Sequence, residues 1–166
     1  MDEFRTRRLA AERLQEGHLA DLVALHLDPE VSRYLGGVRS PTATGAYLAA
    51  NIAHWERHGF GLWVLKTRTG EFAGRAGLRH IEIGGAGEIE VAYTLKRALW
   101  GQGLASEIAA ALAEIGLSQL RLTSLVGIAS AGNVASCRVL EKSGFVHEGT
   151  AIYHGEDVVI YRTRQG

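Results

Sequence analysis

The spacing of hydrophobic positions changes along the chain. In the N-terminal third of the chain it predicts two helices. Apolar residues recur at helical spacing over residues 19–27, and Pro29 then ends that helix. A second helix is predicted over 41–58, because Ser40 and the proline after it are start signals and Gly59 is a stop signal. The positions that define the first helix are Leu19, Leu22, Val23 and His26.

The spacing then changes to two, which indicates strands. Residues 61–67 and 71–83 form two such runs, the second interrupted by Gly74 and Gly77. Residues 88–95 alternate cleanly between two faces. One face holds Ile89, Val91, Tyr93 and Leu95, and the other holds Glu88, Glu90, Ala92 and Thr94.

The remaining segments alternate between helices and strands. A helical stripe of Ile108, Ala111, Leu112 and Ile115 ends near Gly116. A helix over 133–144 has Asn133 as its N-cap and a glycine as its C-cap. Further strands are predicted at 7–14, 122–129, 145–153 and 157–164, the last two as a hairpin. Since no repeat or linker interrupts it, the chain 1–166 is predicted to be a single domain with a mixed α/β (α+β) layer structure.

Composition narrows the class of protein. The 166 residues are 46% hydrophobic and 22% charged, with 18 basic and 18 acidic side chains, so neither disorder nor a nucleic-acid partner is expected. The basic cluster at 5–9 favours a solvated strand end over a binding arm. No apolar run approaches about 18 residues, so no membrane segment is predicted, and the expected location is cytoplasmic.

No metal site is predicted from the sequence. The single Cys137 excludes an internal disulfide and a cysteine-based zinc site. His54 and His58 stand four residues apart, but no third ligand is placed to join them.

The stretch "LWGQGLASE", residues 99–107, joins a predicted strand to a predicted helix. The first N–H groups of a helix lack intrahelical partners and carry the positive end of its dipole. Glycines let the backbone turn so that these groups converge on a phosphate. A Walker-type loop is excluded because Leu104 stands where a lysine is needed. A dinucleotide site is disfavoured because residues 121–126 hold no acid, and a plain glycine turn stays open.

The motifs that precede and follow this loop favour a phosphate-binding loop over a plain glycine turn. "WGQGLASE" is followed by "NVASCRVLEKSGF" at 133–145, and is preceded by "DPEVSRYLGG", "HGFGLWVL", "GRAGL" and "EIEVAYTL". In this order the motifs resemble the GNAT superfamily of acyl-CoA N-acyltransferases, and most closely its ribosomal-protein N-terminal acetyltransferase-like branch. The resemblance implies a strongly twisted mixed sheet with flanking helices. Its central strands, 88–95 and 122–129, splay apart, and acyl-CoA lies in the gap.

The resemblance also implies a set of acetyl-CoA-binding residues. Main-chain amides of the loop would bind the pyrophosphate, although Trp100 stands where the family often has arginine or glutamine. Asn133 would bond the pantetheine arm and Arg138 a phosphate, but Asn133 is equally a helix cap and Arg138 equally a surface residue. The loop residues concerned are Trp100, Gly101, Gln102, Gly103, Leu104, Ala105 and Ser106.

Acetyl transfer from a thioester to an amine sets three chemical tasks. Glu90 matches the position at which many members of the family carry a glutamate as general base. Glu88, His80 or a water chain are the alternatives. The interpretation without a catalytic role makes Glu90 an ordinary residue on a solvated strand face. The amide of Ala92 or Tyr93 would donate to the carbonyl oxygen. Ser136 would donate to the departing sulfur, or it only closes the helix end.

The expected acceptor is the N-terminal α-amine of a protein, attacked directly in a ternary complex. The alternatives are a small-molecule amine, such as an amino acid, a polyamine or an antibiotic, or a non-catalytic acyl-CoA-binding module. The protein is expected to be a monomer or a homodimer, with the terminal strand at 157–163 as a possible dimer edge.

Overall fold

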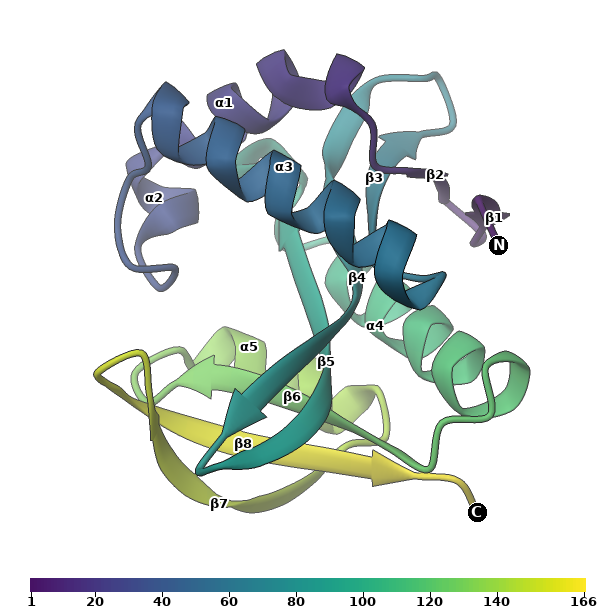
Figure 1. Cartoon of the computed structure of the whole chain (residues 1–166), viewed down its shortest axis with the longest axis vertical. Coiled ribbons are helices and arrows are strands. Elements are labelled where there is room, and N and C mark those ends of the chain that lie inside the picture. Colours follow the sequence, from purple (N-terminus) through teal and green to yellow (C-terminus); the bar gives the residue numbers. More distant parts are fainter. The chain divides into compact units, whose positions relative to one another are not determined.

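The computed structural model describes residues 1–166, which form two compact units (Figure 1). The N-terminal unit comprises Met1–Gly77 with Tyr93–Leu104, and the C-terminal unit comprises Leu78–Ala92 with Ala105–Gly166. Two long strands, β4 (Phe72–Ile83) and β5 (Ala86–Leu95), run from one unit into the other. The strands are hydrogen-bonded in the order β1-β2-β3-β4-β5-β6-β8-β7, a mixed sheet as predicted.

Helices α1 (Leu19–Leu27) and α3 (Pro41–His58) of the N-terminal unit have the predicted bounds. The Ser40 side chain accepts a hydrogen bond from the Ala43 N–H, and Gly59 ends α3 with φ of 76°. Two short elements escaped prediction, strand β1 (Glu3–Arg5) and helix α2 (Pro29–Ser32). Both are too short to show a hydrophobic period.

Strands β2 (Leu9–Arg13), β3 (Leu62–Thr67) and the first part of β4 are antiparallel neighbours. At Gly77 an added Cβ would lie 2.2 Å from the carbonyl oxygen of Gly61 and 2.6 Å from the Cα of Leu62. The glycine in β4 therefore permits a close backbone approach. The core beneath these strands includes Leu22, Trp55, Leu62, Trp63 and Leu65.

Helix α4 spans Leu104–Glu114, and all of it except Leu104 belongs to the C-terminal unit. The π-helical turn η3 (Ile115–Gln119) and strand β6 (Ser124–Ser130) follow in the same unit. Helix α5 (Val134–Lys142) and the hairpin of β7 (Val146–Tyr153) and β8 (Glu156–Arg164) complete it. β8 pairs with β6 on one side and β7 on the other, so it offers no edge. The expected dimer edge at 157–163 is therefore wrong, and β7 is the edge strand.

The predicted splaying of the central strands is present. Strands β5 and β6 are parallel, and their register consists of one pair, Glu90 opposite Val126. β6 instead pairs with β8 along its whole length, from Ser124 to Ser130.

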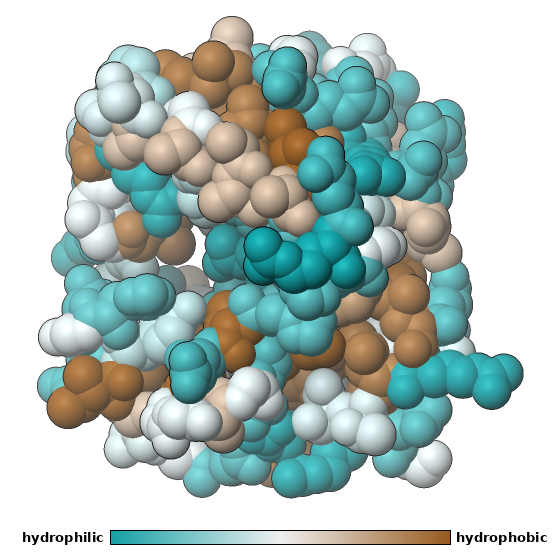
Figure 2. Space-filling model, viewed as in Figure 1, coloured by the Kyte–Doolittle hydropathy of each residue, from teal (hydrophilic) through white to brown (hydrophobic).

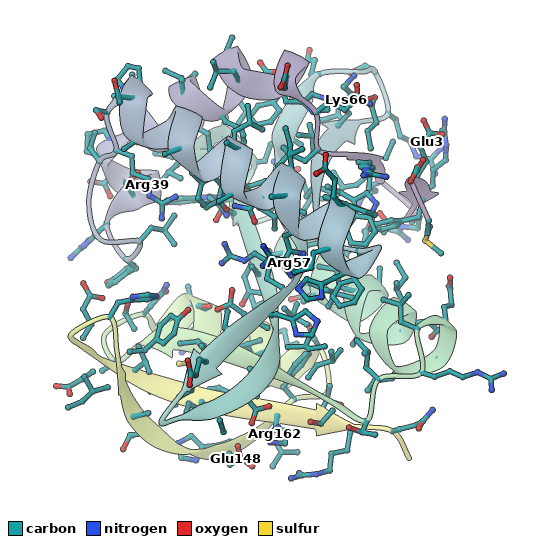
Figure 3. The ribbon with its side chains drawn as sticks, in the orientation of Figure 1. Glu3, Arg39, Arg57, Lys66, Glu148 and Arg162 are labelled. Atoms are coloured by element: carbon teal, nitrogen blue, oxygen red, sulfur yellow. The ribbon has the colours of Figure 1, made fainter.

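One arginine links four strands of the C-terminal unit. Arg162 of β8 donates from Nε to Glu148 Oε1 of β7 at 2.8 Å, and its terminal nitrogens donate to both carboxylate oxygens of Glu88 in β5 at 2.7 and 2.9 Å. Figure 3 shows Arg162 and Glu148 on their neighbouring strands. A further bond reaches Ser124 Oγ of β6 at 2.9 Å. Glu88 and then Glu148 raise the pKa of Arg162 above its usual range, so the arginine stays charged.

Apolar side chains at the surface are scattered. Figure 2 shows brown, hydrophobic residues in separate groups among hydrophilic ones on the face drawn. The most exposed large apolar residues are Val146 and Ile152 of β7. None of the helices combines the length and the apolar character that crossing a membrane requires.

A polar network lies inside the N-terminal unit. His26 of α1 is 1% exposed and Arg75 of β4 is 3% exposed. Arg75 Nε donates to His26 Nε2 at 3.1 Å, so His26 carries its proton on Nδ1 and donates to Thr44 Oγ1 at 2.9 Å. Burial, followed by the positive charges of Arg75 and Arg39, lowers the pKa of His26 to about 3. The imidazole is therefore neutral in the folded protein.

This buried neutral histidine predicts a pH dependence of stability. As the pH falls below about 6.5 the unfolded chain binds a proton at residue 26, whereas folded His26 does not until the pH nears 3. Its contribution to stability is complete above pH 6.5 and decreases toward pH 3. Between pH 5.5 and 4, the free energy of unfolding in urea should therefore fall with decreasing pH more steeply in wild type than in His26→Gln, by up to about 1.4 kcal/mol per pH unit.

The exposed residue His147 provides the matched control. His147→Gln should keep the wild-type dependence. Equal slopes in wild type and His26→Gln would contradict a buried neutral imidazole at residue 26.

Candidate functional site

The glycine loop has the geometry that a phosphate cradle needs. Gly101 and Gly103 both have φ of 78°, a conformation that residues with a Cβ rarely adopt. α4 begins directly afterwards at Leu104, so the first N–H groups of the helix lack intrahelical partners. A Cβ added to Gly101 would meet no atom within 4 Å, so the backbone there is open.

Trp100 braces the start of this loop. Its indole Nε1 donates to the carbonyl oxygen of Leu95 at 2.9 Å, across the short helix η2 (Arg97–Leu99). The side chain is 47% exposed. The contact gives Trp100 a structural role in holding the segment between β5 and α4.

Arg8 reaches the same loop from the start of the chain. Its NH1 donates to the carbonyl oxygen of Gln102 at 2.8 Å, although the two residues are 94 positions apart. Its NH2 lies 3.5 Å from the place where a Cβ on Gly103 would be. The resulting cluster joins a guanidinium group to the positive end of a helix, and both favour an anion. The expectation of a merely solvated basic strand end is therefore wrong for Arg8.

Helix α5 begins as predicted. The Asn133 side chain accepts a hydrogen bond from the Ser136 N–H at 3.2 Å, so Asn133 is the N-cap. Asn133 and Ser136 are half-buried, and Arg138 is exposed. At the other end of α5, Ser143 Oγ donates to the carbonyl oxygen of Val139 at 2.7 Å and lies 3.4 Å from the carbonyl oxygen of Ser106, in the first turn of α4.

Glu90 is a buried carboxylate with a cationic partner. The residue is 7% exposed, and Arg79 NH2 of β4 donates to its Oε1 at 2.7 Å. Burial, and then the negative charge of Glu90, raises the pKa of the nearby Tyr153 hydroxyl. The plain reading of Glu90 as part of a solvated strand face is wrong. Glu90 is therefore a buried acid balanced by arginine at the one residue pair that joins β5 to β6.

The two alternative bases lie in different surroundings. Glu88 has both carboxylate oxygens bound by Arg162, within the bridge that links four strands. His80 is exposed. Of the three candidates, Glu90 is therefore the only buried one. Ala92 and Tyr93, two and three residues beyond the single pair of β5 with β6, are half-buried.

The structure groups the predicted residues within each unit. The loop residues up to Leu104 and Tyr93 belong to the N-terminal unit, together with Arg8. The C-terminal unit holds the other predicted residues, Glu90, Ala92, Ala105, Ser106, Asn133, Ser136 and Arg138. Arg8 and Arg79 were missed as members of the site. Arg8 lies in the basic cluster seen in the sequence, but its partner is too distant along the chain for a local pattern to show it.

No group of three or more His, Cys, Asp or Glu side chains is placed to hold a metal ion.

A family model described as an acetyltransferase (GNAT) domain matches residues 8–146. Among curated proteins, the uncharacterized protein YkkB of Bacillus subtilis is 29% identical over 138 residues, which is 82% of this chain and 80% of that protein.

Solved structures share the fold over nearly the whole chain. An acetyltransferase from Agrobacterium tumefaciens has 27% identity and a TM-score of 0.86, with 99% of this chain and 95% of that chain covered. RimL, a ribosomal L7/L12 α-N-protein acetyltransferase in complex with coenzyme A, has 23% identity and a TM-score of 0.80, with 96% and 95% covered. A spermidine N-acetyltransferase from Vibrio cholerae has 18% identity and a TM-score of 0.76, with 95% of each chain covered.

Proposed function

The chain belongs to the GNAT family of acetyltransferases, which use acetyl-CoA and act on amines, and on that premise we propose that it acetylates the N-terminal α-amine of a protein. The sequence motifs favour this acceptor. The fold that the chain shares with RimL is compatible with it, as it is with a polyamine acceptor, because the spermidine enzyme shares the fold too. The charges of the protein itself support the first of these two acceptors.

The pairing of acidic side chains carries the proposal. A polyamine needs several carboxylates that converge and are free to bind its cations. Four carboxylates within the sheet already have cationic partners: Glu12 with Lys66, Glu90 with Arg79, and Glu88 and Glu148 with Arg162. This pattern favours an acceptor with one reacting amine.

Glu90 supplies the first chemical step. The amine arrives as an ammonium ion and must lose a proton before its nitrogen can form a bond to the acetyl carbon. Glu90 accepts this proton, directly or through one water, while Arg79 balances the carboxylate charge at this buried position. The nitrogen lone pair is then free to attack the thioester.

Backbone and hydroxyl groups serve the other two steps. An N–H group of Ala92 or Tyr93 donates to the carbonyl oxygen, on which negative charge develops. Ser136 donates its hydroxyl proton to the sulfur as the carbon–sulfur bond breaks, and it regains a proton from the nitrogen of the tetrahedral intermediate. The amide and a free thiol result, Glu90 releases its proton to solvent, and no covalent bond to Cys137 is required.

The glycine loop and Arg8 together hold the phosphates of acetyl-CoA. Main-chain N–H groups from Gly101 to Ser106 donate to the pyrophosphate oxygens. Arg8 fixes the loop through Gln102 and adds a positive charge beside it. Arg8 thus supplies the side-chain charge that Trp100 cannot.

An acceptor screen tests the proposed function. Acetyl-CoA is incubated with peptides that have free N-termini, with amino acids, with spermidine and with an aminoglycoside, and thiol release is followed. We expect turnover with peptides, and none with the same peptides once their N-termini are blocked. Preference for spermidine or the aminoglycoside would contradict the acceptor class. Acetyl-CoA binding without turnover on any amine would indicate a non-catalytic module.

Glu90→Gln tests the general base. The amide keeps the shape of the side chain but accepts no proton at neutral pH, so kcat/KM should fall by on the order of 100-fold or more. The affinity for CoA should stay unchanged. The exposed Glu82→Gln of β4 is the matched control and should keep wild-type activity. An intact rate and pH profile in Glu90→Gln would show that the proton is accepted elsewhere, by Glu88, His80 or a water chain.

Arg8→Met tests the phosphate cradle. Loss of a charge-assisted contact to the loop should weaken CoA binding about tenfold, as measured by calorimetry. Arg7→Met removes the same charge from the neighbouring exposed side chain, and its affinity should change less than about twofold. Equal effects of the two substitutions would reduce the role of Arg8 to general electrostatics.

A further inference from the structure

Tyr153, the last residue of β7, lies near the carboxylate of Glu90. The negative charge of Glu90 and, more weakly, the positive charge of Arg79 act on its hydroxyl. These two charges form one ion pair, because Arg79 NH2 donates to Glu90 Oε1 at 2.7 Å. All three residues belong to the C-terminal unit. The phenol is therefore a third polar group beside this buried pair.

The strand register places Tyr153 and Glu90 on the same face of the sheet. Residues paired across neighbouring strands have their side chains on one face, and the face alternates at each step along a strand. Glu90 pairs with Val126, and Val126 pairs with Arg162 of β8. Glu156, an even number of steps from Arg162 along β8, pairs with Tyr153.

Helix α5 covers the opposite face. A Cβ added to Gly127 of β6 would collide with Leu140 of α5. Tyr161 of β8 pairs with Gly127, and its hydroxyl donates to Glu141 Oε1 of α5 at 2.8 Å. Two tyrosines of one hairpin therefore differ in use. Tyr161 binds a helix, whereas the Tyr153 hydroxyl forms no hydrogen bond with another group of the protein.

The turn after Tyr153 holds the residue in place. His154 and Gly155 join β7 to β8 in a hairpin and have φ of 51° and 77° (Figure 1). Positive φ at both positions gives the two-residue turn whose twist matches that of the strands. The ring of His154 packs edge-on against that of Tyr153, with centroids 4.1 Å apart. Tyr153 is thus held by the fold while it is only half-buried.

A neutral phenol can relay a proton. Its O–H group donates while its oxygen accepts, so one proton enters as another leaves. Burial, and then the charge of Glu90, raises the pKa of the Tyr153 hydroxyl above its usual range, so the phenol is neutral at pH 7. Glu90 is 7% exposed, and a fixed hydroxyl beside it gives the proton a path that does not depend on solvent.

We propose that the Tyr153 hydroxyl lies between the acceptor amine and Glu90 and relays the proton from one to the other. This inference rests on the proposed function, in which Glu90 is the general base. The nitrogen gives a proton to the Tyr153 oxygen while the Tyr153 O–H gives its own proton to the Glu90 carboxylate. Tyr153 ends the step as it began, Glu90 is neutral, and the nitrogen lone pair is free to attack the thioester carbon.

Two substitutions of Tyr153 distinguish a relay from a packing role. With a peptide that has a free N-terminus as acceptor, Tyr153→Phe should lower kcat about tenfold or more and leave the CoA affinity unchanged in calorimetry. Tyr153→Ala leaves room for a water in place of the hydroxyl, so its kcat should exceed that of Tyr153→Phe. A lower kcat in Tyr153→Ala than in Tyr153→Phe would overturn the relay, because loss of packing would then explain both.

The double variant Glu90→Gln/Tyr153→Phe tests whether the two residues share one proton path. Residues that act as a unit have strongly non-additive effects on rate. We therefore expect the double variant to be about as slow as Glu90→Gln alone. Rate losses that multiply would indicate separate roles and would overturn the relay.

Tyr161→Phe is the matched control, because it removes a hydroxyl from the opposite face of the same hairpin. Its kcat should stay close to that of wild type. A loss equal to that of Tyr153→Phe would overturn the relay, since any hydroxyl of the hairpin would then have the same effect.

The outcomes also separate the two proposals. A wild-type kcat in Tyr153→Phe beside a slow Glu90→Gln would overturn the relay and leave Glu90 as the base. A wild-type kcat in Glu90→Gln would overturn the base itself, and the relay with it.

Discussion

Strands β5 and β6 pair at a single position, Glu90 opposite Val126, and the placement of the candidate site depends on the divergence of the two strands at this point. Each strand must satisfy its backbone hydrogen bonds elsewhere, because unpaired buried N–H and C=O groups are costly. β6 does so with β8 over its full length, and β5 is the neighbour of β4. Glu90 therefore stands at the last point of β5–β6 pairing, enclosed by protein yet next to backbone groups that β6 does not use.

Buried charge at that point requires a partner, and the protein supplies arginines. Arg79 balances Glu90, and Arg162 balances Glu88 and Glu148. The two arrangements differ. Arg162, on β8, is held by groups on three other strands and serves the sheet, whereas Arg79 donates to one oxygen of the Glu90 carboxylate, Oε1.

Local signals predicted much of the fold. The bounds of α3 follow from Ser40, Pro41 and Gly59, because caps and stop signals act within one turn of the helix. The loop at 101–103 likewise follows from its glycines, and its positive φ values agree. Two short elements, α2 and β1, lack the length for a periodic pattern.

The burial of Glu90 and the contacts between residues far apart in the sequence could not be predicted from local patterns. Alternation along 88–95 assigned Glu90 to a face but could not show that this face is covered. Arg8 meets Gln102 across 94 positions of sequence, and the buried contact of Arg75 with His26 joins β4 to α1. The likeness to the GNAT family, rather than any local pattern, indicated the splayed strands. The same likeness assigned the roles of Asn133 and Ser136, whose helix-capping geometry alone is seen here.

The central claim is that the amides of Gly101–Ser106, supported by Arg8, hold the pyrophosphate of acetyl-CoA. A crystal structure of the protein with bound CoA tests it most directly. We expect pyrophosphate oxygens within hydrogen-bond distance of these amides, with the Arg8–Gln102 contact retained. A CoA molecule whose pyrophosphate lies elsewhere, with the loop amides unliganded, would contradict it.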